Sequence, residues 1–265
     1  MARAWLTDRT VLRASGQDRV TFLQGLVSND VAAASPDRLV WAGFLTPQGR
    51  YLSDFFIRHD ADSLLLDVPA EHADFLRTRL SRFRLRADVQ IEATDLTVEA
   101  LWDGETVPDA LPDPRLEEAG LRRLVPRPSV TPEPSIESYH AHRIGLGLPD
   151  PSDCESEKTL LIEANFDWLN GISFQKGCYM GQELTARTHY RGLVKKRLVP
   201  VRGDAGLPPS GTILKIDGRD IGQMCSSAGT RGLAFLRREV WSTTISHEEL
   251  TLTPLLPDWF RDETS

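Results

Sequence analysis

The sequence predicts a mixed α+β protein whose last quarter is all β. Three observations lead to this fold class. Two amphipathic segments, residues 17–28 and 70–83, have apolar residues at the spacing of helices. Between them, residues 38–69 read as strands joined by short turns. After about residue 195, strand and hairpin patterns replace helical ones. We therefore expect a small β domain or barrel at the C-terminal end.

The first predicted helix, residues 17–28, has Val20, Leu23 and Val27 on one face and Asp18 in position to cap it. The strands that follow form a meander. Its first link, Thr46-Pro-Gln-Gly49, fits a type I turn with proline second and glycine fourth. Links this short predict antiparallel pairing.

The second predicted helix, residues 70–83, places Leu76, Leu80 and Phe83 on one face. Several arginines decorate the same region. They form either a solvated face or a patch that binds an anion or a partner, and the sequence leaves both interpretations open. Residues 87–102 then read as further strands.

The middle and end of the chain give weaker signals. Residues 108–134 contain seven prolines, which predicts a connector, because proline blocks helices and cannot donate to a sheet. A short helix is expected at 135–145. Residues 215–220 contain an Asp-Gly pair between alternating segments, which predicts a hairpin, and residues 232–240 read as another strand.

Composition narrows the function classes. The chain has 265 residues and a net charge of −7, which argues against a nucleic-acid partner. No apolar run is long enough for a transmembrane helix, so no membrane partner is expected. Residues 1–10 resemble neither a signal peptide nor a transit peptide. Three cysteines without a CxxC pair predict no disulfide framework and no resident iron–sulfur cluster, and they favour a cytoplasmic location.

Residues 176–183, Lys-Gly-Cys-Tyr-Met-Gly-Gln-Glu, form the segment richest in chemistry, and we call it the signature segment. Gly177 and Gly181 permit backbone turns on either side of Cys178. Good helix formers follow, so Cys178 should lie just before a helix N-terminus and near Lys176. Both features favour a thiolate. The residues alone leave two interpretations open: a reactive thiol, or a small buried apolar side chain.

Other clusters are less informative. His140 and His142 are two residues apart and so do not share a helix face, and Cys154 is twelve residues further on. No metal site is predicted. Neither a phosphate-binding GxxxxGK[ST] motif nor a GxGxxG motif occurs.

The signature segment resembles the motif KGCYxGQE of the YgfZ family of folate-binding proteins. The matching positions are Lys176, Gly177, Cys178, Tyr179, Gly181, Gln182 and Glu183. The family tends to have an arginine four residues later, and Arg187 occupies that position. Similarity to the family extends over most of the chain.

The resemblance implies a fold similar to that of the glycine-cleavage T-protein. Two α/β modules, one of them split in the sequence, and a C-terminal antiparallel β-barrel would surround a central channel that binds tetrahydrofolate. The expected divisions are 1–40 with 130–194, then 41–129, then 195–265.

The resemblance also implies site residues. Glu163 matches a glutamate that accepts the donor pair of the pterin ring from a strand of the T-protein-like fold. Arg191 belongs to a basic cluster that could receive the anionic tail of folate. Asp54 matches an aspartate that T-proteins use near folate, with a register uncertain by one residue. YgfZ-type proteins generally lack the catalytic arrangement of the T-protein.

Three functions follow from these observations. The first is an accessory factor that binds tetrahydrofolate and helps to assemble or repair clusters in iron–sulfur proteins, with Cys178 as its essential thiol. The second is a folate-dependent aminomethyltransferase or demethylase of the T-protein type, which would use Asp54. The third is a binding module without folate. Whether the chain is an enzyme stays open at this point.

Overall fold

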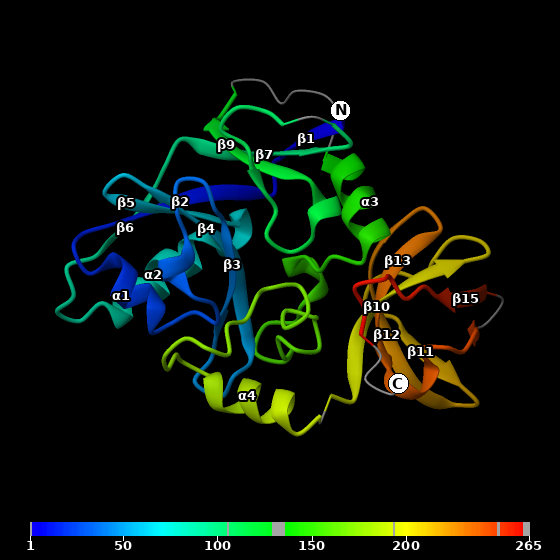
Figure 1. Cartoon of the computed structure of the whole chain (residues 1–265). Coiled ribbons are helices and arrows are strands. Elements are labelled where there is room, and N and C mark those ends of the chain that lie inside the picture. The colour runs from blue at the N-terminus through cyan, green and yellow to red at the C-terminus, as the bar shows by residue number, and fades with distance from the viewer. Residues whose placement is uncertain (1, 105, 129–135, 193, 248–249, 262–265) are drawn as a thin grey trace.

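A computed structural model describes residues 2–104, 106–128, 136–192, 194–247 and 250–261. The predicted α+β fold class is confirmed: in these ranges, helices accompany antiparallel sheets of five, four and six strands (Figure 1). Short 3-10 helices connect them at Val31–Ala33, Ala70–His72, Glu117–Ala119, Pro151–Asp153 and Arg238–Val240. No described helix is long and apolar enough to cross a lipid bilayer.

The five-stranded sheet has the order β3-β4-β5-β2-β6. Its strands are β2 (Arg9–Ser15), β3 (Val40–Leu45), β4 (Tyr51–Asp60), β5 (Ser63–Pro69) and β6 (Gln90–Ala93). The predicted meander is therefore correct. So is its first turn, where the Gly49 amide donates to the Thr46 carbonyl at 2.9 Å and Gly49 has a φ of +76°.

Two helices cover one face of this sheet. α2 (Ala73–Phe83) buries Leu76 and Leu80 as predicted. α1 (Arg19–Gln24) is shorter than expected, because the chain leaves the helix at Gly25 so that Val27 can bridge to Phe44 of β3. The other face of the sheet carries Trp41, Tyr51 and Phe56, which pack in a second core.

The four-stranded sheet corrects one expectation. Its order is β1-β7-β9-β8, with strands β1 (Ala2–Leu6), β7 (Leu96–Trp102), β8 (Leu111–Pro112) and β9 (Leu121–Pro126). The proline-rich stretch therefore contains two strands and is not only a connector. Pro112 lies on the edge strand and Pro126 ends its strand, which are positions where a missing N–H is tolerated. The connector's residues 129–134 lie outside the described residues.

The predicted mid-chain helix is present as α3 (Ile136–Leu146). After it, residues 161–170 form successive turns, and α4 (Gln182–Tyr190) follows the signature segment as expected. Glu163 was expected on a strand, and this is wrong. The chain folds back there, with Asn165 and Asn170 in left-handed conformations at φ of +62° and +59°.

The C-terminal barrel is a six-stranded sheet of order β11-β12-β13-β10-β15-β14. Its strands are β10 (Lys196–Gly203), β11 (Ile213–Ile216), β12 (Arg219–Ala228), β13 (Arg231–Arg237), β14 (Ile245–His247) and β15 (Leu250–Pro254). The edge strands β11 and β14 lie against each other, so the barrel is nearly closed. The hairpin predicted at 215–220 joins β11 to β12 through Asp217 and Gly218, both with positive φ.

Strands from distant parts of the sequence share sheets. β2 pairs with β5, so the five-stranded sheet contains residues from both sides of residue 41. The division into 1–40 with 130–194, 41–129 and 195–265 stays a prediction. In Figure 1 the barrel stands beside α3, and α4 runs below β3.

Candidate functional site: an exposed cysteine on a fixed loop

The signature segment lies across the end of α1 and the turn between β3 and β4. The Met180 amide donates to the Gly25 carbonyl at 3.0 Å. Gly181 has a φ of +82°, and a side chain there would come within 2.6 Å of the Thr46 carbonyl oxygen. Gly181 is thus required both by its backbone conformation and by close packing. The signature segment therefore packs directly against the Thr46–Gly49 turn.

Lys176 anchors the other end of the segment. Its ammonium group donates to the carbonyl oxygens of Gln24, Val27 and Asn29 at 2.8, 2.8 and 2.7 Å. Burial lowers the pKa of Lys176 to about 8, and Asp30 opposes that shift. The group is therefore still protonated at neutral pH. An ammonium has three donors, and all three are directed at carbonyls of the last residue of α1 and of the segment just after it.

Cys178 is exposed, and it lies between the two anchors. The neighbouring Tyr179 is buried, and its burial raises its pKa to about 12. The three donors of Lys176 are all used by backbone carbonyls, so this ammonium donates no hydrogen bond to the sulfur atom of Cys178. The loop instead holds Cys178 outward on a rigid base.

The remaining polar signature residues belong to α4. Gln182 begins α4, with its amide donating to the Tyr179 carbonyl at 3.2 Å. Glu183 and Arg187 pair with each other at 2.5 Å along the exposed side of α4. Such an exposed i,i+4 pair stabilises a helix by only about 0.3–0.5 kcal/mol. These two charges are available to a partner.

The other cysteines differ from Cys178. Cys225 is buried in β12, and Cys154 is partly buried at the end of a 3-10 helix. Burial, reinforced by Asp153 for Cys225 and by Asp54 for Cys154, raises the pKa of both thiols. Neither is suited to act as a thiolate at neutral pH.

Glu163 is a mostly buried carboxyl group, with its side chain 14% exposed. Its carboxylate accepts from the Leu160 amide at 3.3 Å and lies 3.9 Å from the Lys196 ammonium. Its burial raises its pKa.

Asp54 is bonded inside the core. The residue is 4% exposed, and one carboxylate oxygen accepts from the Trp41 indole N–H while the other accepts from the Tyr51 hydroxyl, both at 2.7 Å. The predicted basic cluster around Arg191 does not lie on one surface. Arg191 is exposed just beyond α4, whereas Arg197 is buried and bound to Asp167.

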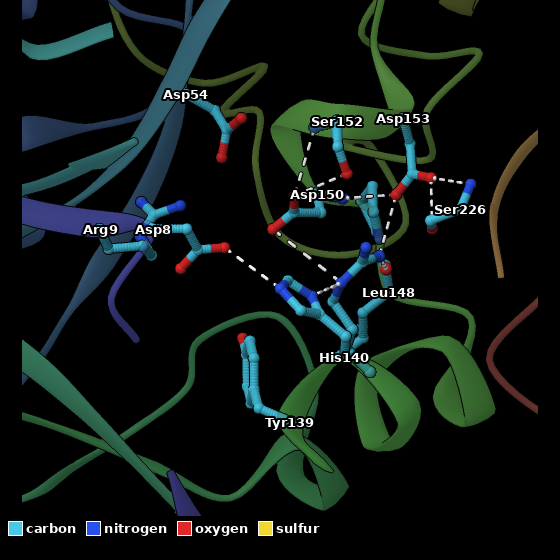
Figure 2. Close-up of polar contacts among 12 residues, drawn as sticks. Asp8, Arg9, Asp54, Tyr139, His140, Leu148, Asp150, Ser152, Asp153 and Ser226 are labelled. Atoms are coloured by element: carbon cyan, nitrogen blue, oxygen red, sulfur yellow. Dashed lines mark hydrogen bonds and ion pairs between the residues drawn. The ribbon is translucent and has the colours of Figure 1, made fainter. Parts of the chain in front are cut away.

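A network of polar contacts that the sequence did not reveal connects α3 with Asp8 on one side and with β12 on the other (Figure 2). His140 Nδ1 accepts from Arg143 Nε at 2.9 Å, and His140 Nε2 lies 3.2 Å from Asp8. Arg143 donates to Asp153 at 2.9 Å, and Asp153 accepts from the Ser226 hydroxyl of β12 at 2.6 Å. No local motif predicts this network of contacts, because its residues come from four separate segments of the sequence.

Asp8, His140 and Asp150 lie close enough together to suggest a metal site. The hydrogen bonds argue against one. Because Nδ1 of His140 accepts from Arg143, the neutral ring carries its proton on Nε2, the atom that faces Asp8. A cation there would have to displace this proton beside two buried arginines, Arg9 and Arg143.

Comparisons with known proteins define the family. The model described as "CAF17, C-terminal beta-barrel domain" matches residues 195–262. The human protein "Iron-sulfur cluster assembly factor IBA57, mitochondrial" is 32% identical over 96% of this chain and 84% of its own length. The chain belongs to the CAF17/IBA57 family. The YgfZ-type assignment made from the motif is finer than these matches show.

Other IBA57 relatives agree. The mouse protein is 31% identical over 96% of this chain. The homolog from Mycosarcoma maydis is 37% identical over 79% of this chain, but the match spans only 59% of its length. The chain thus spans little more than half the length of that fungal relative. These relatives are named mitochondrial, which contradicts the expected cytoplasmic location. A low cysteine content indicates a reducing environment and does not distinguish compartments that share it.

The fold is that of the T-protein. The glycine cleavage system aminomethyltransferase T from Bartonella henselae superposes with a TM-score of 0.74 over 98% of this chain and 86% of its own, at 14% identity. This level of identity shows the shared fold alone. The predicted T-protein-like architecture, with a C-terminal barrel, is confirmed.

Proposed function

We propose that this chain is an accessory factor in the assembly of iron–sulfur clusters and that Cys178 is its working thiol. The observation that carries the proposal is the single exposed cysteine of the described residues, held outward between Lys176 and Gly181. The process, iron–sulfur cluster assembly, is the one given in the names of the IBA57 relatives.

A single exposed thiol, that of Cys178, limits how this chain could bind a cluster. Cysteine-bound clusters usually need four thiolate ligands, and Cys225 and Cys154 lie inside the fold. A cluster that meets Cys178 therefore needs its other ligands from an iron–sulfur protein or its assembly machinery. The exposed Glu183 and Arg187 beside it offer polar contacts for such a transient partner. A role of this kind is that of a maturation factor.

The experiment replaces Cys178 in cells that lack their own copy of the protein. Cys178→Ala and Cys178→Ser should fail to restore the activities of iron–sulfur enzymes, while Cys154→Ser, a change at a less accessible thiol, should restore them. Equal amounts of each protein must be present. Normal enzyme activities with Cys178→Ala would contradict the role of the thiol.

Tetrahydrofolate binding is a second candidate property, supported by the T-protein-like fold and by the carboxyl group of Glu163. Titration with a reduced folate tests it, with Glu163→Gln as the variant that should weaken binding. Affinity weaker than about 1 mM, equivalent to about −4 kcal/mol, would contradict it. The aminomethyltransferase alternative is not favoured, because the carboxylate it needs, Asp54, is already bonded.

A further inference from the structure

Asp54 and Trp41 form a closed pair in the second core. Trp41 is 1% exposed, and its indole N–H donates to Asp54 at 2.7 Å. The other oxygen of Asp54 accepts from Tyr51, a fully buried phenol whose pKa is raised by burial and by this carboxylate. Each oxygen of the carboxylate thus accepts a buried, charge-assisted hydrogen bond.

The indole ring is held in place by its neighbours. Phe166 stacks on it with centroids 3.9 Å apart and planes 24° apart, and the Arg115 guanidinium lies 5.5 Å from its centroid. Gly171 approaches so closely that a Cβ atom there would come within 2.8 Å of the ring. The turns of residues 166–171 therefore enclose the indole like a bound ligand.

Trp41 also lines a surface cleft of about 630 Å³ together with Asn29, Pro114 and Phe174, although the residue is only 1% exposed. A planar fused ring that stacks on an aromatic side chain and donates an N–H to a carboxylate has the recognition chemistry of a pterin.

We propose that Asp54 is a structural residue and not a folate ligand, because Trp41 and Tyr51 already occupy its two carboxylate oxygens. Any folate that this chain binds is held elsewhere, with Glu163 as the available carboxyl group. The proposal goes beyond cluster assembly through Cys178, which does not require Asp54.

The test follows the indole N–H of Trp41 by NMR while 5-formyltetrahydrofolate is added to the full chain. Trp41→Phe identifies the signal among the six tryptophans, since it removes the N–H and keeps an aromatic ring. We expect a signal that exchanges slowly with solvent and stays unchanged up to about 1 mM ligand, a concentration that detects even weak binding.

One further measurement completes the test. If the folate binds, Asp54→Asn should change its Kd by less than about twofold, well under the tenfold that about 1.4 kcal/mol represents. A Trp41 signal that shifts or loses its protection as the folate saturates would overturn the proposal. The wild-type signal decides the matter if Asp54→Asn does not fold. Cluster-enzyme activity is a separate readout, so failure here leaves the proposed function untouched.

Discussion

The ammonium group of Lys176 lies 2.8 Å from the carbonyl oxygen of Val27, which is 149 residues earlier in the chain. Together with the carbonyls of Gln24 and Asn29, this contact attaches the signature segment to the end of α1. The lysine of the motif is therefore an anchor for the loop that presents Cys178.

Lys176→Met should remove this anchor. Three carbonyl groups would lose a charged donor, and bonds to charged groups contribute about 1.5–3 kcal/mol, so we expect a loss of about 2 kcal/mol in the free energy of unfolding, measured with urea. Lys176→Arg should not restore it, because a planar guanidinium cannot direct donors at three carbonyls around one point. Wild-type stability in Lys176→Met would show that the contact is unimportant.

Gly181→Ala and Gly177→Ala form a matched pair in the same loop. Gly181 has positive φ and a carbonyl oxygen within 2.6 Å of any Cβ, whereas a Cβ at Gly177 would meet nothing within 4 Å. We expect Gly181→Ala to lower the free energy of unfolding by about 2 kcal/mol or more and Gly177→Ala to change it by less than about 0.5 kcal/mol. Equal effects in urea unfolding would be inconsistent with this packing.

If Gly177→Ala folds normally but fails to support iron–sulfur enzymes, the open space at Gly177 is needed by the partner. This outcome would separate a binding requirement from a folding requirement within two neighbouring glycines.

The three thiols should react at different rates with an alkylating reagent. Cys178 is exposed, whereas burial raises the pKa of Cys154 and Cys225. In the native protein, mass spectrometry should show one rapidly modified cysteine, and Cys178→Ala should abolish that phase. In urea all three should react. Rapid native modification of Cys225 would contradict the burial of β12.

Asp150 should make the free energy of unfolding depend on pH in the acid range. Burial acts to raise its pKa, but Arg143, Arg9 and His140 outweigh burial and lower it to about 2 from an ordinary value near 3.8. The folded state therefore favours the charged form. The resulting stabilisation, about 2 kcal/mol, is complete above about pH 5 and is lost as the pH falls toward 2.

Asp150→Asn tests this, since asparagine can still cap the following 3-10 helix. At pH 6 the variant should be less stable than the wild type by about 2 kcal/mol, and at pH 3 the difference should narrow to about half. The control is Asp217→Asn on the exposed hairpin turn, where asparagine tolerates positive φ. A difference that is independent of pH would exclude the ionic explanation.

Much of the fold was predictable because its signals are local. The period of Leu76 and Leu80 predicts α2, the Thr46–Gly49 turn predicts the meander, and Asp217-Gly218 predicts the barrel hairpin. The two strands among the prolines were missed, because a sheet tolerates proline at an edge or a strand end, and only pairing partners decide which positions those are.

The sequence by itself determined the α+β class, the C-terminal β domain and the position of the cysteine on which the proposed function depends. Cys178 could be identified from the motif, because a motif is a local pattern. The tertiary structure decided what surrounds each candidate residue. Lys176 donates to backbone carbonyls, Asp54 accepts a hydrogen bond from Trp41, and Glu163 lies in a turn. Burial and hydrogen-bond partners come from segments more than a hundred residues apart in some cases, so no local pattern contains them.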